Sequence, residues 1–175
     1  MHFCHEDRLH SPDGWDHYRV LDLENLQFEK TVNRLCGVDK TSMEVPAMPR
    51  KLISSGSHLE PEIGFSRAVR VGQFVAIAGT APIAVAGGTA TPGDVYGQTV
   101  RCLEIIARAV AEAGGTLANI IRTRIMLTDI SSWRDAARAH GEVFREIRPA
   151  CTFVQVSSFI DPTWLVEIEA DCVVE

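Results

Sequence analysis

The stretch "LVEIEADCVV", residues 165–174, constrains the fold more than any other part of the sequence. Its apolar and acidic side chains alternate: Val166, Ile168, Ala170, Cys172 and Val174 are interleaved with Glu167, Glu169 and Asp171. Successive side chains of a β-strand point to opposite faces of the sheet. We therefore expect a sheet with one apolar face under helices and one open face that carries three carboxylates.

The sequence between residue 50 and this strand predicts more strands and two helices. Residues 66–82 form two short strands around Gly72 and Gln73, and residues 119–130 and 150–156 form one strand each. The helices are expected at 94–115 and 131–147, and both lie on crossovers that the handedness rule places on one face. The fold class is therefore α+β, with one mixed sheet of five or six strands and two helices on one face.

The open face of this sheet mixes charge with apolar groups. Arg122 and Arg124 alternate with Thr123 and other non-charged side chains, so we place them beside the three carboxylates. Met126 and Phe153 are the apolar members that we expect there. Such a face is suited to packing between subunits that leaves polar clefts.

Composition limits the classes of function. With 17 basic and 23 acidic side chains the chain has a net charge of −6, which disfavours nucleic-acid binding. The sequence contains no run of 18 apolar residues, which a membrane span would need, and its first segment lacks the pattern of a signal peptide. We therefore expect a cytoplasmic protein. Five cysteines without a CxxC pair indicate reduced thiols rather than disulfides or a zinc cage.

Residues 1–47 differ from the rest of the chain. They predict an extension that is weakly structured or forms a short helix near 22–35, whereas residues 48–175 form the main domain. Four metal-ligand types crowd the first ten residues, but they lack a standard spacing and we predict no metal site: His2, Cys4, His5 and His10.

Four motifs from about residue 50 to 175 resemble the reactive intermediate deaminase family (RidA/YjgF), once labelled L-PSP endoribonuclease. They are "IGFSRAVRVGQFVAIAGTAP", "AEAGGTLANIIRTRIMLTDI", "RPACTFVQV" and "LVEIEADCVV". The resemblance implies a chorismate-mutase-like fold that forms a homotrimer with clefts between subunits. It also implies hydrolysis of short-lived enamines or imines, without a cofactor or metal.

The resemblance also assigns site residues. It places the acid/base glutamate at Glu167, the glycine that lines the cleft at Gly79, and the aromatic residue of the cleft mouth at Phe65. A carboxylate beside a water molecule suits this chemistry, because an imine carbon is already electrophilic and needs only proton transfer and an oriented water.

The sequence departs from the family at Cys151. Active deaminases have an arginine there that binds the substrate carboxylate with two hydrogen bonds, and a thiol cannot replace it. Phe153 makes the expected pocket more apolar. We therefore expect a substrate other than the usual 2-imino acids, or a trimer that binds a metabolite without catalysis.

Several residues have a structural interpretation beside the functional one. Glu167 could form an ion pair with Arg122 or Arg124, and Arg67 is interpreted as a surface ion pair in preference to a relocated anion-binding group. Cys151 is interpreted as filling space rather than as a nucleophile, because a nucleophilic thiol needs a base nearby and no motif places a histidine beside it. We expect His140 to be a surface residue.

Overall fold

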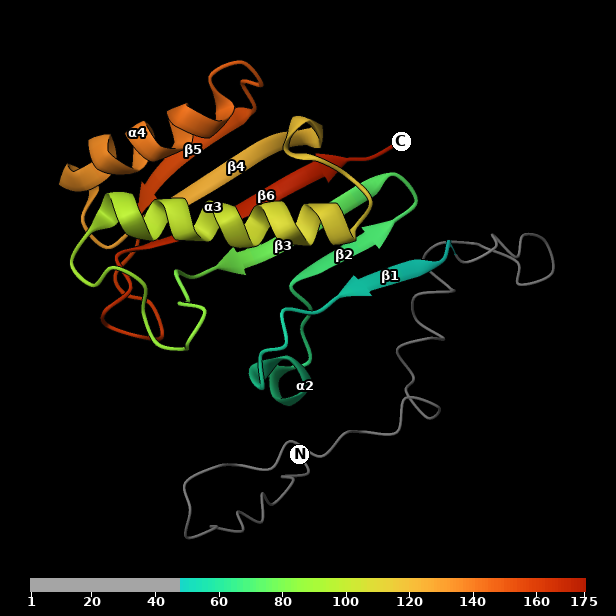
Figure 1. Ribbon diagram of the computed structural model, residues 1–175, viewed down its shortest axis with the longest axis horizontal. Coiled ribbons are helices and arrows are strands. Elements are labelled where there is room, and N and C mark those ends of the chain that lie inside the picture. The colour runs from blue at the N-terminus through green and yellow to red at the C-terminus, as the bar shows by residue number, and fades with distance from the viewer. Residues whose placement is uncertain (1–47) are drawn as a thin grey trace, which may run out of the picture. The chain divides into compact units, whose positions relative to one another are not determined.

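The computed structural model describes residues 48–175, so the short helix near 22–35 and the histidines of the first ten residues lie outside the described residues. Within 48–175 the strands form one six-stranded sheet with the order β1-β2-β3-β6-β4-β5 (Figure 1). The elements follow one another along the chain as β1 (Arg50–Ile53), α2 (Leu59–Ile63), β2 (Ala68–Val71), β3 (Phe74–Thr80), α3 (Val95–Glu112), β4 (Ile120–Leu127), α4 (Trp133–Phe144), β5 (Ala150–Gln155) and β6 (Val166–Val173).

The sheet is mixed, as the sequence predicts. Strands β4 and β5 are parallel, whereas β1–β2, β2–β3, β3–β6 and β4–β6 are antiparallel. The tight turn between β2 and β3 contains Gly72 at φ 59°, a left-handed conformation that glycine adopts readily. Strand β6, last along the chain, lies in the interior of the sheet between β3 and β4.

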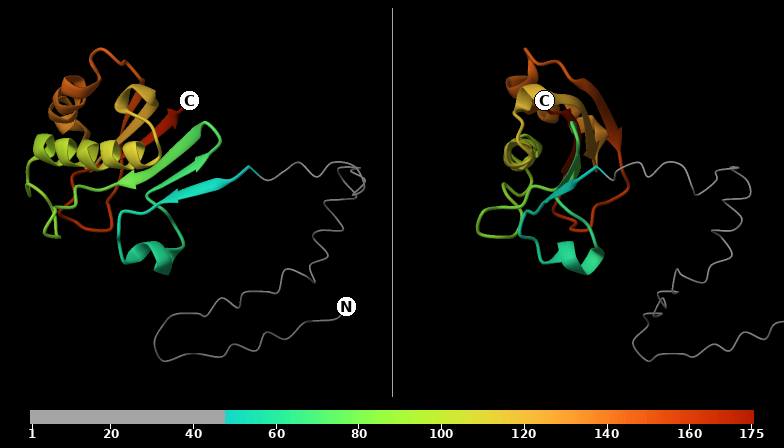
Figure 2. Two further views of the ribbon diagram at one scale, coloured as in Figure 1. Left: turned by 45° about the vertical axis from the view of Figure 1, so that its right-hand side comes forward. Right: turned by 90° about the vertical axis from the view of Figure 1, so that its right-hand side faces the viewer.

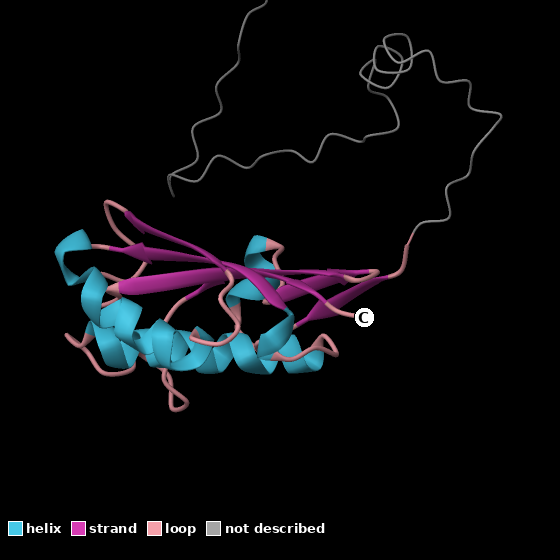
Figure 3. Ribbon diagram, turned by 90° about the horizontal axis from the view of Figure 1, so that it is seen from above, coloured by secondary structure: helices cyan, strands magenta, loops and turns pink. Residues whose placement is uncertain are grey.

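Helices α3 and α4 cover one face of the sheet, and neither of them lies on the other face, which we call the open face (Figure 3). The core lies between the helices and the sheet, and the apolar residues of β6 belong to it because Val166, Ile168 and Cys172 are fully buried. From α3, Cys102, Ile106 and Val110 lie on one side of the helix and pack on this face.

Two elements were not predicted from the sequence. Strand β1 extends the sheet beyond β2, and the single-turn helix α2 joins β1 to β2 and ends at Gly64, which has φ 79° (Figure 2). No helix within 48–175 has the length and apolar character needed to cross a membrane.

Candidate functional site

Glu167 lies on the open face of the sheet. Its neighbours along β6, Val166 and Ile168, are fully buried under the helices, so the alternation of the strand turns the Glu167 side chain the other way. Across the sheet its register partner on β4 is Met126. The expected orientation of β6, with its carboxylates on the open face, is thus confirmed.

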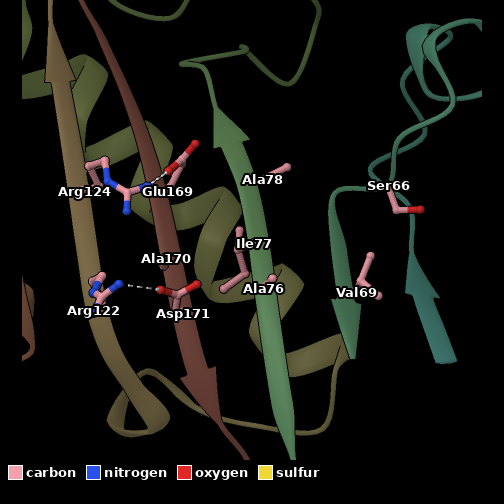
Figure 4. Close-up of a pocket in the computed structure, with 10 residues that line it drawn as sticks. All are labelled: Ser66, Val69, Ala76, Ile77, Ala78, Arg122, Arg124, Glu169, Ala170 and Asp171. Carbon is pink, nitrogen blue, oxygen red and sulfur yellow. Dashed lines mark hydrogen bonds and ion pairs between the residues drawn. The ribbon is translucent and has the colours of Figure 1, made fainter. Parts of the chain in front are cut away.

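The two arginines of β4 pair with the other carboxylates of β6. Nη1 of Arg122 lies 3.8 Å from Oδ2 of Asp171, and Arg124 forms an ion pair with Glu169 (Figure 4). These pairs follow the register of the strands, in which each arginine faces its own carboxylate. The interpretation of Glu167 as the ion-pair partner of either arginine is therefore wrong.

The Glu167 carboxyl group lies against the backbone of Gly79. A Cβ atom at position 79 would be 2.9 Å from Oε1 of Glu167, closer than real contacts allow. Gly79 lies where the register between β3 and β6 shifts, between Ile77 and Thr80. The missing side chain of Gly79 therefore makes room for the carboxyl group.

Arg67 lies at the same end of β3. Its Nη1 donates to the carbonyl oxygens of Ala78 at 3.2 Å and Gly79 at 2.5 Å, and to Oγ1 of Thr80 at 3.0 Å. The centroid of the Phe65 ring is 5.9 Å from its Cζ. Arg67 is half-buried and takes part in none of the ion pairs found within 48–175, so its interpretation as a surface ion pair is wrong.

Glu60, on α2, is a buried carboxylate that sequence reasoning missed. Its Oε1 accepts from the backbone N–H of Ser55 at 2.7 Å and from that residue's hydroxyl at 2.6 Å, and its Oε2 accepts from the Ser54 hydroxyl at 2.5 Å. Burial alone would raise the pKa of Glu60, but these bonds and the charge of Arg67 lower it. The serine-rich loop before Glu60 was the available signal.

Electrostatics separate Glu167 from the other carboxylates of the open face. Burial raises the pKa of Glu167 above its ordinary value, the Glu169 charge adds to this, and Arg67 opposes it. Burial also lowers the pKa of Arg67, against the charges of Glu60 and Glu167. Glu167 is therefore a carboxyl group that takes up a proton more readily than an exposed one, beside a buried cation.

Within one chain, Cys151 and Phe153 do not lie beside Arg67, Gly79 and Glu167. Both lie on the edge strand β5, which β4 separates from β6. Phe153 packs edge to face on Trp133 and His140 of α4, so the prediction that it lies on the open face is wrong. Its register partner is the core residue Ile125, and the same alternation turns the exposed Cys151 toward the side of α4.

His140 is not the surface residue that we expected. It is half-buried, its Nε2 lies 2.9 Å from Oγ1 of the buried Thr123, and its ring packs on Phe144. Burial lowers the pKa of His140, which favours the neutral ring. This polar contact fixes α4 on the sheet, and no sequence signal distinguished Thr123 from its apolar neighbours.

A cavity of about 310 Å³ lies on the open face (Figure 4). Two of its lining residues, Ser66 and Ala78, are next in sequence to Arg67 and Gly79. Its lining combines the two ion pairs of β4 and β6 with an apolar wall from β2 and β3 that includes Val69 and Ala76. Glu167 is not part of the lining, so we assign the candidate site to Phe65, Arg67, Gly79 and Glu167 and treat the cavity as a neighbouring hollow.

No cluster of three metal-binding side chains occurs among residues 48–175, and the three cysteines of that range are free thiols. The arrangement offers proton transfer by Glu167 and charge stabilisation by Arg67.

Comparisons with known proteins agree with the motifs. The family described as Endoribonuclease L-PSP matches residues 55–174. An uncharacterized protein of Streptomyces coelicolor is 38% identical over 120 residues, which cover 68% of this chain and 88% of that protein. The 3-aminoacrylate deaminase RutC of Acinetobacter baylyi is 29% identical over 121 residues, which cover 69% of this chain and 95% of that protein.

The fold matches as well. The crystal structure of Rv2704 from Mycobacterium tuberculosis, a member of the YjgF/YER057c/UK114 family, superposes with a TM-score of 0.65 and is 44% identical, covering 72% of this chain and all of that one. Residues 55–174, which match the family, contain all the residues of the candidate site. The chain therefore belongs to the endoribonuclease L-PSP family, the RidA/YjgF superfamily that its motifs predict.

Proposed function

We propose that the chain forms a cytoplasmic homotrimer that hydrolyses the C=N bond of a small imine, or of the imine form of an enamine. The substrate is one other than the usual 2-imino acids, and Glu167 is the acid/base residue. The observation that carries the proposal is the half-buried Glu167 carboxyl group, which lies against Gly79 on the open face and forms no ion pair with an arginine of residues 48–175.

Glu167 has the properties that the reaction requires. In its acid form it protonates the enamine carbon or the imine nitrogen, which makes the imine carbon more electrophilic. In its carboxylate form it accepts a proton from the water that attacks this carbon, and the resulting carbinolamine breaks down to a carbonyl compound and ammonia. A raised pKa brings the two forms closer to balance near neutral pH, so that one group serves both steps.

The substrate class follows from position 151. The arginine that binds the carboxylate of 2-imino acids in the family is replaced by Cys151, whose thiol is a weak donor. Loss of a bidentate, charge-assisted contact of about 1.5–3 kcal/mol weakens productive binding of those acids about 10- to 100-fold. The related 3-aminoacrylate deaminase supports an enamine with a different spacing between its carboxylate and the reacting carbon.

The open face supports the homotrimer. It joins ion pairs that neutralise one another, Arg122–Asp171 and Arg124–Glu169, with the exposed apolar side chains Leu52, Phe74 and Val154. Apolar surface of this kind is typical of interfaces. We expect the clefts to lie between subunits, so that the edge strand β5 of one copy, with the exposed Cys151, approaches Glu167 of another. Phe153, which packs on Trp133 and His140, is not part of this expected contact.

A non-catalytic trimer that binds or senses a metabolite is the second candidate. The observation that favours it is again Cys151, because membership of a fold family does not imply that the usual reaction of the family is retained when a substrate-binding residue is replaced. Thermal unfolding against a metabolite panel tests this function, since a ligand at 100 times its Kd stabilises the native state by about 2.7 kcal/mol.

Release of ammonia from freshly generated 3-aminoacrylate and 2-aminoacrylate tests the enzyme. We expect turnover of the first and little of the second. Glu167→Gln should abolish turnover while sedimentation still shows a trimer, whereas Glu146→Gln, which removes an exposed carboxylate elsewhere, should change neither. Unchanged turnover in Glu167→Gln would remove Glu167 from the mechanism, and a wild-type monomer would remove the cleft.

Cys151→Arg is the complementary experiment. The exposed position on an edge strand accepts a long side chain without disturbing the core. We expect this variant to gain deamination of 2-aminoacrylate. Efficient deamination of 2-aminoacrylate by the wild-type protein would contradict the inference drawn from Cys151.

A further inference from the structure

One edge of the Arg67 guanidinium group has no hydrogen-bond partner among residues 48–175. We propose that this edge, formed by Nε and Nη2, binds a carboxylate group of the ligand, so that the chain acts on anionic imines or enamines. The inference rests on the proposed function in one respect: the ligand that Arg67 binds is the substrate on which Glu167 acts.

The other side of the guanidinium group is fully used. Nη1 donates to the backbone of Ala78 and Gly79 and to the Thr80 hydroxyl, which fixes the plane of the group. Nε is buried and has no hydrogen-bond partner among residues 48–175, and Nη2 forms no hydrogen bond there either. Buried donors are nearly always paired in native proteins, so an unpaired one indicates a missing partner.

A carboxylate fits this edge by geometry and charge. Nε–H and Nη2–H are parallel donors whose spacing matches the two oxygens of a carboxylate. Arg67 is half-buried and the Phe65 ring lies 5.9 Å from its Cζ, so the contact would form away from bulk water, where charge-assisted hydrogen bonds are strong.

The carboxylates already in the neighbourhood do not take this place. Glu60 directs its oxygens to Ser54 and Ser55, which satisfy them. Glu167 lies against Gly79 and forms no hydrogen bond to Arg67.

Three other arginines near the open face use part of their guanidinium group for contacts within residues 48–175. Arg122 and Arg124 are paired with Asp171 and Glu169, and Arg70 donates to the carbonyl oxygens of Gly72 and Ala113. Arg67 differs from Arg122 and Arg124, which pair through Nη1 alone and are partly exposed, because its unpaired Nε is buried.

Binding at this edge also acts on Glu167. The groups whose charges act on Glu167 are Arg67, which favours its carboxylate, and Glu169, which opposes it; the Cys102 thiol beneath is buried and neutral. A ligand carboxylate on Arg67 offsets the favourable charge, so Glu167 takes up a proton on binding. The acid form that must protonate the substrate is thus produced by the substrate's own charge.

Titration with crotonate and with its neutral isostere crotonamide tests the site without any turnover. We expect isothermal calorimetry of the full chain to show binding of crotonate and at least tenfold weaker binding of crotonamide. Arg67→Lys, which keeps the charge but lacks the paired donors, and Arg67→Gln should each weaken crotonate binding about 10- to 100-fold. Arg108→Gln, which removes an exposed charge on α3, should leave it unchanged.

A measurement on the unsubstituted chain covers the case in which the Arg67 variants do not fold. The buried Nε–H of Arg67 should give a protected nitrogen resonance that shifts on addition of crotonate and stays in place with crotonamide. Equal affinity for the two compounds, or a resonance that responds to Glu167→Gln but not to crotonate, would overturn the proposal.

These results separate the two proposals. Crotonate binding that depends on Arg67, without hydrolysis of any imine, retains the anion site and rejects the enzyme. Hydrolysis that persists in Arg67→Lys with unchanged KM retains the enzyme and rejects the anion site.

Discussion

Alanine at position 79 should displace the Glu167 carboxyl group without straining the backbone. Gly79 is not among the residues with positive φ, so its conformation accepts a side chain. The new Cβ would lie 2.9 Å from Oε1, and ordinary contact begins at 3.4 Å, so the carboxyl group must move by about 0.5 Å. The group that moves is the end of a flexible side chain.

The magnitudes for stability and activity should therefore differ. Rotation of the Glu167 side chain costs about 0.5–1.5 kcal/mol, which bounds the loss of unfolding free energy. Misplacement of a reacting group by about 1 Å lowers rates about 100-fold, so half of that displacement should lower hydrolysis about tenfold. Urea unfolding and ammonia release measure the two effects.

Gly141→Ala is the matched control. Nothing lies within 4 Å of the added Cβ, and the residue lies inside α4. We expect this variant to be more stable by about 0.5–1 kcal/mol, because alanine is the better helix former, and equally active. Wild-type hydrolysis in Gly79→Ala would refute the role of the close approach, and a loss above about 3 kcal/mol would show that the backbone yields instead.

Three further results are expected. Ile106→Ala empties a fully buried site under the sheet and should lower the unfolding free energy by about 2–5 kcal/mol in urea titration. Thr123→Val should lower it by about 1–3 kcal/mol, because the His140 ring loses its partner; a conserved midpoint would show that the contact contributes nothing. The unfolding free energy of Glu167→Gln should rise relative to that of the wild type as the pH increases from the ordinary carboxyl pKa through the raised pKa of Glu167. In this range only the wild type must keep a half-buried charge in the folded state. A difference in unfolding free energy that does not change with pH would contradict this prediction.

The architecture was accessible from the sequence because its signals are periodic. The alternation of β6 placed Glu167 on the open face, and the handedness of the crossovers that contain α3 and α4 placed both helices on the other face. Strand β1 and helix α2 escaped because four or five residues are too short for a period to appear, and no predicted hairpin turn marks them as Gly72 marks the equally short β2.

The details of the site depend on register, which local patterns do not contain. The sequence put two arginines and three carboxylates on one face, but only the pairing of β4 with β6 shows that Glu167 faces Met126. Phe153 was misplaced for the same reason, because its face depends on how β5 pairs with β4. The family motifs supplied Gly79, whereas the contacts of Arg67 with β3 required the structure.

The place of β6 in the sheet has a consequence for biosynthesis. The β1–β2–β3 unit and the β4–β5 pair are joined only through β6, which is translated after both of them. A nascent chain on the ribosome therefore exposes two unsealed strand edges until β6 emerges, and such edges invite aggregation. Because the same strand carries Glu167, no partly synthesised chain can have the proposed acid/base group in place, and completion of the sheet coincides with completion of the candidate site.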